Sequence, residues 1–170
     1  MHEYAYGNEE QRKNILNNLD DVKFALSKNL SDDLDKILNQ EVDASKTELL
    51  IGTTSRVLAK ILGAENYKVT MSVGKAYSAM VDRKTAENSK YYREAFNYHN
   101  LGKEKVIEVL EKSEDPIMII NPISENKGRL PDRLMVITDI LDAKGNNIIV
   151  IQDVNKKGLL YKKRIKVIKS

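Results

Sequence analysis

Apolar residues recur at helical spacing through the first forty residues of the chain. One set is spaced three or four residues apart from position 15 to 26, which predicts an amphipathic helix. Ser31 then stands as a candidate N-cap for a second, shorter helix. The inward positions expected are Ile15, Leu19, Val22 and Leu26 in the first helix, and Leu34, Ile37 and Leu38 in the second.

The middle of the chain alternates short apolar runs with helical patterns. A strand is expected over 49–51, ending at Gly52, and a helix over about 55–62. The alternation in 67–73 predicts a second strand, and a helix follows over 74–80. The polar stretch 81–96 spaces Tyr91, Tyr92 and Phe96 to touch one face of a helix.

After residue 100 the pattern changes from helix to strand. A short amphipathic helix is expected from about Gly102 to 110, and Pro116 ends it. Strands are predicted over 117–120, 133–141, 147–154 and the tail, with the turn 142–146 making a hairpin. Helices followed by strands predict an α+β fold with the helices packed on one face of a sheet of about four strands.

Composition narrows the class of protein. At 170 residues the chain is long enough for one domain with a hydrophobic core. The absence of cysteine excludes disulfides, thiolate catalysis and sulfur-ligated metals, and no apolar run approaches the length of a membrane span. A cytoplasmic protein without a membrane partner is therefore expected.

The positive charge is concentrated at the C-terminal end. Residues 156–170 carry seven basic side chains and no acid, so with a net charge of +3 the rest carries 3 − 7 = −4. This asymmetry is typical of a protein with a polyanionic partner. A lysine-rich edge strand, protected against aggregation, has the same composition.

His99 is the only histidine in the interior of the chain. It precedes the helix expected near Gly102, whose free N–H groups and positive dipole end favour a phosphate, and Lys103 and Lys105 add charge there. Its ordinary pKa suits proton transfer at neutral pH. The spacing by itself is more typical of a histidine that caps or packs at a helix start. No phosphate loop, zinc motif or nucleophile elbow is present, and no cofactor is expected.

Polar residues elsewhere offer further contacts. The loop 121–133 contains hydroxyl, amide and basic groups suited to phosphate or a 2′-hydroxyl, namely Ser124, Asn126, Lys127, Arg129 and Arg133, although a solvated connection has the same composition. The tyrosines suit base stacking and also a half-buried core. Thr138 interrupts the most apolar strand, where a threonine is also typical as a strand-forming residue whose hydroxyl is satisfied within the sheet. In the tail, Lys162, Arg164 and Lys166 are expected on one face and Tyr161, Ile165 and Val167 on the other.

The order of three segments carries a resemblance. "LIGTTSRVLAKILG", then "YHNLGKEKVIEVLEKSEDPIMII", then "LMVITDILDAKGNNIIVIQDV" resembles the C-terminal domain of phage MuF-type proteins. That group is similar to the barnase–EndoU–colicin–RelE-like nuclease superfamily. The resemblance covers roughly 48–168 and divides the chain into a helical N-terminal extension, 1–45, and a nuclease-like α+β domain, 46–170. It implies helices packed on a four-stranded antiparallel sheet.

The resemblance also implies a metal-independent ribonuclease of a phage or mobile element, acting in the cytoplasm of a bacterial host. The family's histidine corresponds to His99, its strand threonine to Thr138 and its loop serine to Ser124. We further expect Arg133 or Lys103 to stabilise the transferring phosphate. The RNA contacts expected are Lys103, Ser124, Arg129, Lys162, Arg164 and Lys166. An immunity or antitoxin protein, or a host protein, is a further expected partner.

The chain departs from the family pattern in its last strand. Lys163 and Val167 stand where the family tends to carry Asn and Ser, and Ser55 stands where a proline is common. These departures keep a second hypothesis open: a non-catalytic phage protein that uses the same fold to bind and inhibit a host protein or nucleic acid. A third is an ADP-ribosyltransferase, since other domains associated with MuF proteins have that activity.

Overall fold

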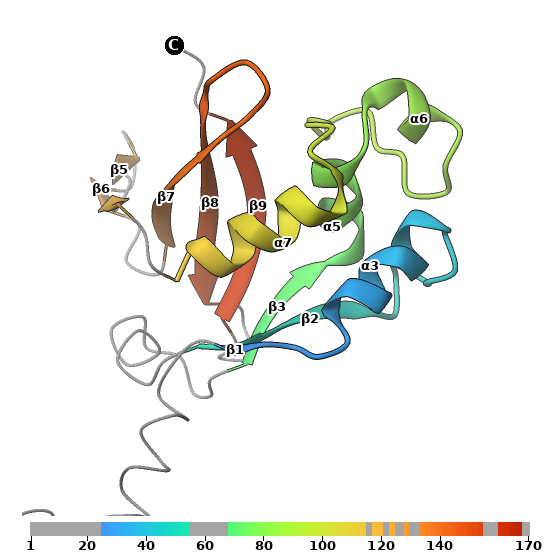
Figure 1. Cartoon of the computed structure of the whole chain (residues 1–170), viewed down its shortest axis with the longest axis horizontal. Coiled ribbons are helices and arrows are strands. Elements are labelled where there is room, and N and C mark those ends of the chain that lie inside the picture. Colours follow the sequence, from blue (N-terminus) through green and yellow to red (C-terminus); the bar gives the residue numbers. More distant parts are fainter. Residues whose placement is uncertain are drawn as a thin grey trace, which may run out of the picture.

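A computed structural model describes residues 25–54, 68–114, 117–120, 123–124, 128–129, 133–154 and 160–167. Within these ranges the fold is α+β, as the residue pattern predicts. Four helices are described: α3 (Leu30–Leu38), α5 (Val73–Met80), α6 (Arg83–Glu87) and α7 (Gly102–Lys112). In Figure 1, α7 crosses in front of β7, β8 and β9, α3 lies beside β2, and α6 lies beyond the ends of the strands.

The strands form a larger sheet than the four strands expected. The strands are β1 (Ala25–Leu26), β2 (Glu48–Thr53), β3 (Lys68–Ser72), β4 (Met118–Ile120), β7 (Arg133–Leu141), β8 (Asn147–Val154) and β9 (Leu160–Val167). Their order is β1-β2-β3-β9-β8-β7-β4, and β5 (Ile123–Ser124) pairs separately with β6 (Gly128–Arg129). The four C-terminal strands expected from the sequence are present, but three more extend the sheet.

The two parts of the sheet meet at one short parallel contact. The pairs β1–β2 and β2–β3 are antiparallel, as are β9–β8, β8–β7 and β7–β4. Between them, β3 and β9 pair in parallel over Val69–Leu160 and Thr70–Tyr161. Periodicity within each strand contains no information on this distant pairing, so the sequence pattern missed it.

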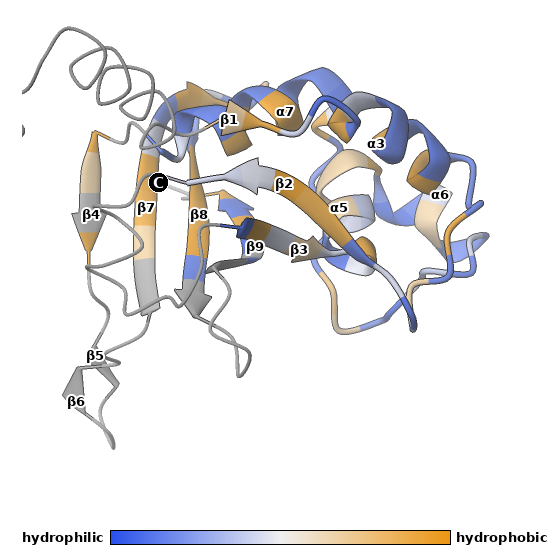
Figure 2. Cartoon of the chain, turned by 90° about the horizontal axis from the view of Figure 1, so that it is seen from below, coloured by the Kyte–Doolittle hydropathy of each residue, from blue (hydrophilic) through white to orange (hydrophobic). Residues whose placement is uncertain are grey.

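The core lies between the helices and one face of the sheet. One cluster of buried side chains joins Leu34 of α3, Tyr77 of α5, Val106 of α7 and Val150 of β8. Residues 25–45 therefore contribute to the same core as the rest of the described chain. Ile149 and Ile151, on the opposite face of β8, are also buried although they lie outside this cluster. Figure 2 shows the concentration of apolar residues on the strands.

Three local expectations change. Leu26 lies in β1 and not in a helix, because it pairs with Gly52 of β2. The two backbones approach so closely that a Cβ added to Gly52 would overlap the carbonyl oxygen of Ala25. Tyr91, Tyr92 and Phe96 lie in an irregular segment, because α6 ends at Glu87. Asn29, rather than Ser31, is the N-cap of α3. The helix expected over 55–62 and most of the first one lie outside the described residues.

Candidate functional site

A buried polar cluster surrounds Lys162, which the sequence placed on an exposed face. The Nζ of Lys162 donates to the Oε1 of Glu114 at 2.8 Å and the Oγ of Ser113 at 2.9 Å, and also to the Oε1 of Gln152. Thr54 donates its hydroxyl to the Oε2 of Glu114 at 2.6 Å. Lys162 and Glu114 are 0% and 6% exposed. Because it is buried, Lys162 is not available to contact RNA, contrary to the prediction from the sequence.

Burial controls the protonation of this cluster. It lowers the pKa of the Lys162 ammonium below the ordinary value for lysine, while the neighbouring Glu114 carboxylate acts in the opposite direction. The Nε2 of buried Gln152 has no hydrogen-bond partner in the described part of the chain. The cluster ties the C-terminal end of α7 to β8, to β9 and to the residue that follows β2, so it joins both parts of the sheet.

The inward orientation of the Lys162 side chain, opposite to the one predicted, has a local cause in β9. The pairing of β8 with β9 shifts between Ile151 and Gln152, so β9 contains one extra residue there, a β-bulge. Lys162 and Ile165 therefore face the helices together, although they are three residues apart. Arg164 and Lys166 are opposite Ile151 and Ile149, and both are half-buried. Because those isoleucines are buried, this part of the opposite face is covered.

Thr138 is also internal. Its hydroxyl donates to the carbonyl oxygen of Ile148 at 2.7 Å and accepts from the backbone N–H of Ile140 at 3.3 Å, and the residue is 0% exposed. These bonds satisfy the hydroxyl where the pairing of β7 with β8 shifts. Thr138 therefore has a role within the sheet, and its hydroxyl does not reach the surface.

For the other loop and strand residues predicted to contact RNA, the structure describes at most the backbone. Ser124 lies in β5, Arg129 in β6 and Arg133 at the start of β7. Their side chains, together with Asn126 and Lys127, lie outside the described residues. These contacts stay predictions.

His99 lies at the other end of α7 from the buried cluster. Its backbone N–H donates to the carbonyl oxygen of Ser78 on α5 at 3.0 Å, and the residue is half-buried. Helix α7 spans 102–112, so about 16 Å of helix separates its two ends. His99 and Lys162 therefore do not share one site.

Lys103 is engaged in an ion pair near His99. Its Nζ lies 2.9 Å from the Oδ1 of Asp35 on α3, and this hydrogen-bonded carboxylate raises the pKa of Lys103 above its usual range. The side chain is 19% exposed. Lys103 therefore fastens α7 to α3, and an RNA phosphate would compete with Asp35 for it.

The segment before His99 is held by Arg83. Its guanidinium donates to the carbonyl oxygen of Phe96 at 2.7 Å and to the hydroxyl of Tyr92 at 3.1 Å. The rings of Tyr92 and Tyr98 stack with centroids 5.9 Å apart and 17° between their planes. Helix periodicity did not predict this arrangement, although the density of Tyr and Arg over 83–98 was a signal for it.

Two further cations accompany these rings. The Nζ of Lys75 lies 3.7 Å from the centroid of the Phe96 ring, and the exposed Arg93 donates its backbone N–H to the Tyr98 hydroxyl at 2.9 Å. We call this group the 92–99 surface; it consists of Lys75, Arg83, Tyr92, Arg93, Phe96, Tyr98 and His99. The surface combines aromatic rings, cations and the only interior histidine of the chain.

The described residues contain neither a membrane-spanning helix nor a metal-binding group. No helix there is long and apolar enough to cross a membrane, and no group of three or more acidic, histidine or cysteine side chains is arranged to hold a metal ion. Comparison with protein-family models, curated proteins and solved structures found no match to the chain.

Proposed function

We propose that the chain binds single-stranded RNA on the 92–99 surface and cleaves it with His99 as a metal-independent, toxin-like ribonuclease. The observation that carries this proposal is that three aromatic side chains, Arg93 and His99 share the segment 92–99, which Arg83 of α6 braces and in which the Phe96 ring is contacted by Lys75 of α5. Base stacking on aromatic rings combined with phosphate contacts to Lys and Arg is a general means of binding single strands.

Charge and local geometry support the same surface. Residues 75–103 contain six basic and three acidic side chains, a net charge of +3. Helix α7 has no side-chain N-cap, so its first N–H groups are not satisfied by a capping side chain next to His99. A phosphate positioned at these groups would bring the 2′-hydroxyl or the leaving oxygen of RNA close to the imidazole.

The chemistry proposed for His99 is proton transfer. Its imidazole would take the proton of a 2′-hydroxyl or give one to the leaving 5′-oxygen, and the product would be a cyclic phosphate. The resemblance of the ordered sequence motifs to barnase–EndoU–colicin–RelE-like nucleases favours this reaction. The antiparallel block β9–β8–β7–β4, with α5 and α7 packed against it, is compatible with that family's architecture.

A cleavage assay in EDTA tests the catalytic part. Purified protein is incubated with fluorescent RNA in EDTA beside His99→Ala, and we expect the substitution to reduce the rate by about 10²–10⁴-fold. Lys46→Ala, which removes an exposed cation far from this surface in the sequence, serves as the control and should cleave normally. Cleavage that requires a divalent metal, or that His99→Ala leaves unchanged, would contradict the mechanism.

A binding assay tests the surface separately. Anisotropy with a labelled single-stranded RNA should show that Phe96→Leu weakens binding about five-fold or more, because base stacking contributes about 1–3 kcal/mol per base. Arg93→Ala should weaken binding and reduce its salt dependence, whereas Lys46→Ala should not weaken it to the same extent. Equal effects of Arg93→Ala and Lys46→Ala would indicate unspecific charge attraction.

A second candidate function is binding and inhibition without cleavage. Two side chains of the expected catalytic and RNA-contact set, Thr138 and Lys162, are buried and bonded within the core, and this observation favours it. Wild-type protein that binds RNA on the 92–99 surface but releases no product in either EDTA or metal would select this alternative.

A further inference from the structure

A primary amine and a primary amide lie side by side in the buried cluster around Lys162. Lys162 of β9 and Gln152 of β8 are direct partners across the two strands, and both residues are 0% exposed. The Nζ of Lys162 contacts the Oε1 of Gln152. Because the Cδ of the amide is bonded to that same oxygen, only a small movement separates the amine from the carbon that a nucleophile attacks.

The two polar atoms of the Gln152 amide have different surroundings. Its Oε1 accepts from Lys162, whereas its buried Nε2 has no hydrogen-bond partner in the described part of the chain. A buried amide nitrogen without a partner is unusual in a folded protein. A donor at the oxygen stabilises the negative charge that forms there when a nucleophile adds to Cδ. The amide is therefore arranged for attack at its carbon and for loss of its nitrogen.

A carboxylate is placed to move the protons of such a reaction. The Oε1 of Glu114 lies 2.8 Å from the Nζ of Lys162, and its Oε2 accepts from the hydroxyl of Thr54 at 2.6 Å. A general acid or base must be within hydrogen-bond reach of the proton it transfers, and Glu114 is. Burial lowers the pKa of Lys162, which favours the neutral, nucleophilic amine.

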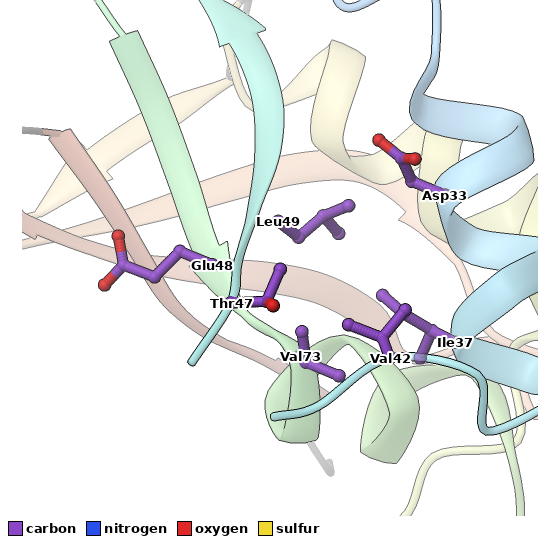
Figure 3. A pocket seen from close by; sticks show the side chains of 7 residues that line it. All are labelled: Asp33, Ile37, Val42, Thr47, Glu48, Leu49 and Val73. Carbon is purple, nitrogen blue, oxygen red and sulfur yellow. The ribbon is translucent and has the colours of Figure 1, made fainter. Parts of the chain in front are cut away.

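The pocket of about 100 Å³ between α3, β2 and the start of α5 has no comparable pair of groups. Figure 3 shows an apolar lining that includes Ile37, Leu49 and Val73, while the carboxylates of Asp33 and Glu48 point away from it on opposite sides. Of these two places in the described chain, only the Lys162 cluster brings a nucleophile, an electrophile and a proton carrier together.

We propose that Lys162 and Gln152 react with each other in the folded chain and form an isopeptide bond between β9 and β8. Glu114 takes one proton from the ammonium, and the Nζ attacks the Cδ of Gln152. Glu114 then gives that proton to Nε2, the Cδ–Nε2 bond breaks and ammonia leaves. The Nζ passes a second proton through Glu114 to this ammonia. One lysine ammonium and one primary amide thus become one secondary amide and one ammonium ion.

The bond would fasten the strand that joins the two parts of the sheet. Strand β9 pairs with β8 on one side and, over two residue pairs, with β3 on the other. Before the reaction Lys162 is the charged partner of Glu114, and after it Lys162 no longer titrates. None of these residues belongs to the 92–99 surface, so the inference goes beyond the proposed function.

Mass spectrometry of the denatured full chain tests the bond directly. We expect wild-type protein, kept folded at neutral pH, to be lighter than its sequence requires by one molecule of ammonia. Tandem spectra of a digest should show the peptide that contains Gln152 joined to the peptide that contains Lys162. A wild-type chain that keeps its full sequence mass after prolonged incubation would overturn the proposal, whatever the variants do.

Two lysine substitutions in β9 form a matched pair. Lys162→Met should restore the full sequence mass, whereas Lys166→Met, four residues further along the strand, should keep the deficit. A deficit that persists in Lys162→Met would place the loss of ammonia elsewhere and overturn the proposal.

Glu114→Gln tests the proton transfer. It should slow formation of the bond about 10²-fold or more, since general acid–base catalysis contributes about 10²–10⁴-fold. Circular dichroism identifies the preparations that are folded. A folded Glu114→Gln chain that gains the bond as fast as wild type would overturn the role of Glu114.

Discussion

His99 shows how the role of one residue depends on its three-dimensional neighbours. Spacing alone favoured a residue that caps or packs at a helix start over a catalytic group. The structure does place it directly before α7, with its backbone tied to Ser78 of α5. The structure also shows aromatic and cationic side chains next to His99 in the chain, held by Arg83. Helix periodicity did not predict them, because Tyr92 and Phe96 lie in an irregular segment.

Asp142 gives a prediction on pH dependence. Its carboxylate accepts from the backbone N–H groups of Lys144 and Asn146 in the β7–β8 turn, and these bonds hold its pKa below the usual 3.8. A lowered pKa in the folded state stabilises the protein above pH 3.8. This contribution disappears as the pH falls through the pKa that Asp142 has in the folded protein. The difference in unfolding free energy between wild type and Asp142→Asn should therefore shrink in acid.

Urea unfolding between pH 2 and 6, about the interval over which such a carboxylate titrates, measures this difference. Lys144→Ala, which leaves the backbone donors in place, is the control and should not reproduce the acid effect. A difference that is constant over the whole interval would show that the hydrogen bonds do not depend on the charge of Asp142.

Tyr91 gives a prediction on stability. Its hydroxyl donates to the carbonyl oxygen of Val42 at 2.5 Å and accepts from the Val42 N–H at 3.2 Å, and burial raises the pKa of the hydroxyl. Tyr91→Phe leaves both backbone groups without this partner, so unfolding free energy should fall by about 1–3 kcal/mol. The matched Tyr92→Phe loses one exposed bond to Arg83 and should cost less. Equal losses would contradict this account.

At the scale of the element, β9 and α7 depart furthest from the sequence prediction. Alternation along a strand assumes one residue per pleat, and the extra residue of the β9 bulge breaks this rule between Lys162 and Arg164. Helix α7 was predicted nearly at its observed start, but the pattern did not reveal that its C-terminal end meets a lysine from β9. The apolar run of β8 did contain a hint, since Gln152 interrupts it and a buried amide requires a partner.

The Lys162–Glu114 pair gives a double-mutant prediction. Lys162→Met leaves a buried carboxylate without its cation, and Glu114→Gln leaves a buried ammonium without its anion, so each should cost about 3–5 kcal/mol. The double substitution leaves neither charge, and it should cost clearly less than the sum of the two. Additive losses, measured by urea unfolding, would show that the two charges do not act as a pair.

The same pair predicts a trend at alkaline pH. Because burial lowers the pKa of Lys162 below 10.5, the unfolded chain binds more protons between the folded value and 10.5. The stability of the wild type relative to Lys162→Met should therefore rise with pH in this interval. A relative stability that falls there would mean that Glu114 outweighs burial.

At the scale of the whole molecule, the structure joins parts that the sequence had separated. The helical N-terminal extension was set at 1–45, yet Leu30, Leu34 and Ile37 of α3 lie in the same buried cluster as α5, α7 and the sheet. Lys103 and Asp35 add an ion pair between α7 and α3. The described part of the chain therefore has one core that includes residues 30–38.

This single core predicts cooperative unfolding. Leu34 is 0% exposed, so Leu34→Ala should lower the unfolding free energy by about 2–5 kcal/mol. The loss should appear in one transition, seen equally by probes in α3 and in the β7–β8 hairpin. Ser31→Ala, an exposed residue of the same helix, should change stability little. Separate transitions for α3 and the hairpin would show that α3 is an independent unit.

The sequence by itself determined the α+β class, helices α3, α5 and α7, and the β7–β8 hairpin. These features depend on periodicity, helix stops and turn residues, which act over a few neighbouring positions. Only the tertiary structure decided that β3 pairs with β9, that Lys162 faces inward and that Thr138 is satisfied within the sheet. Those outcomes depend on one bulge and on contacts between residues far apart in the chain, where burial outweighs the local preference of a charged side chain for water.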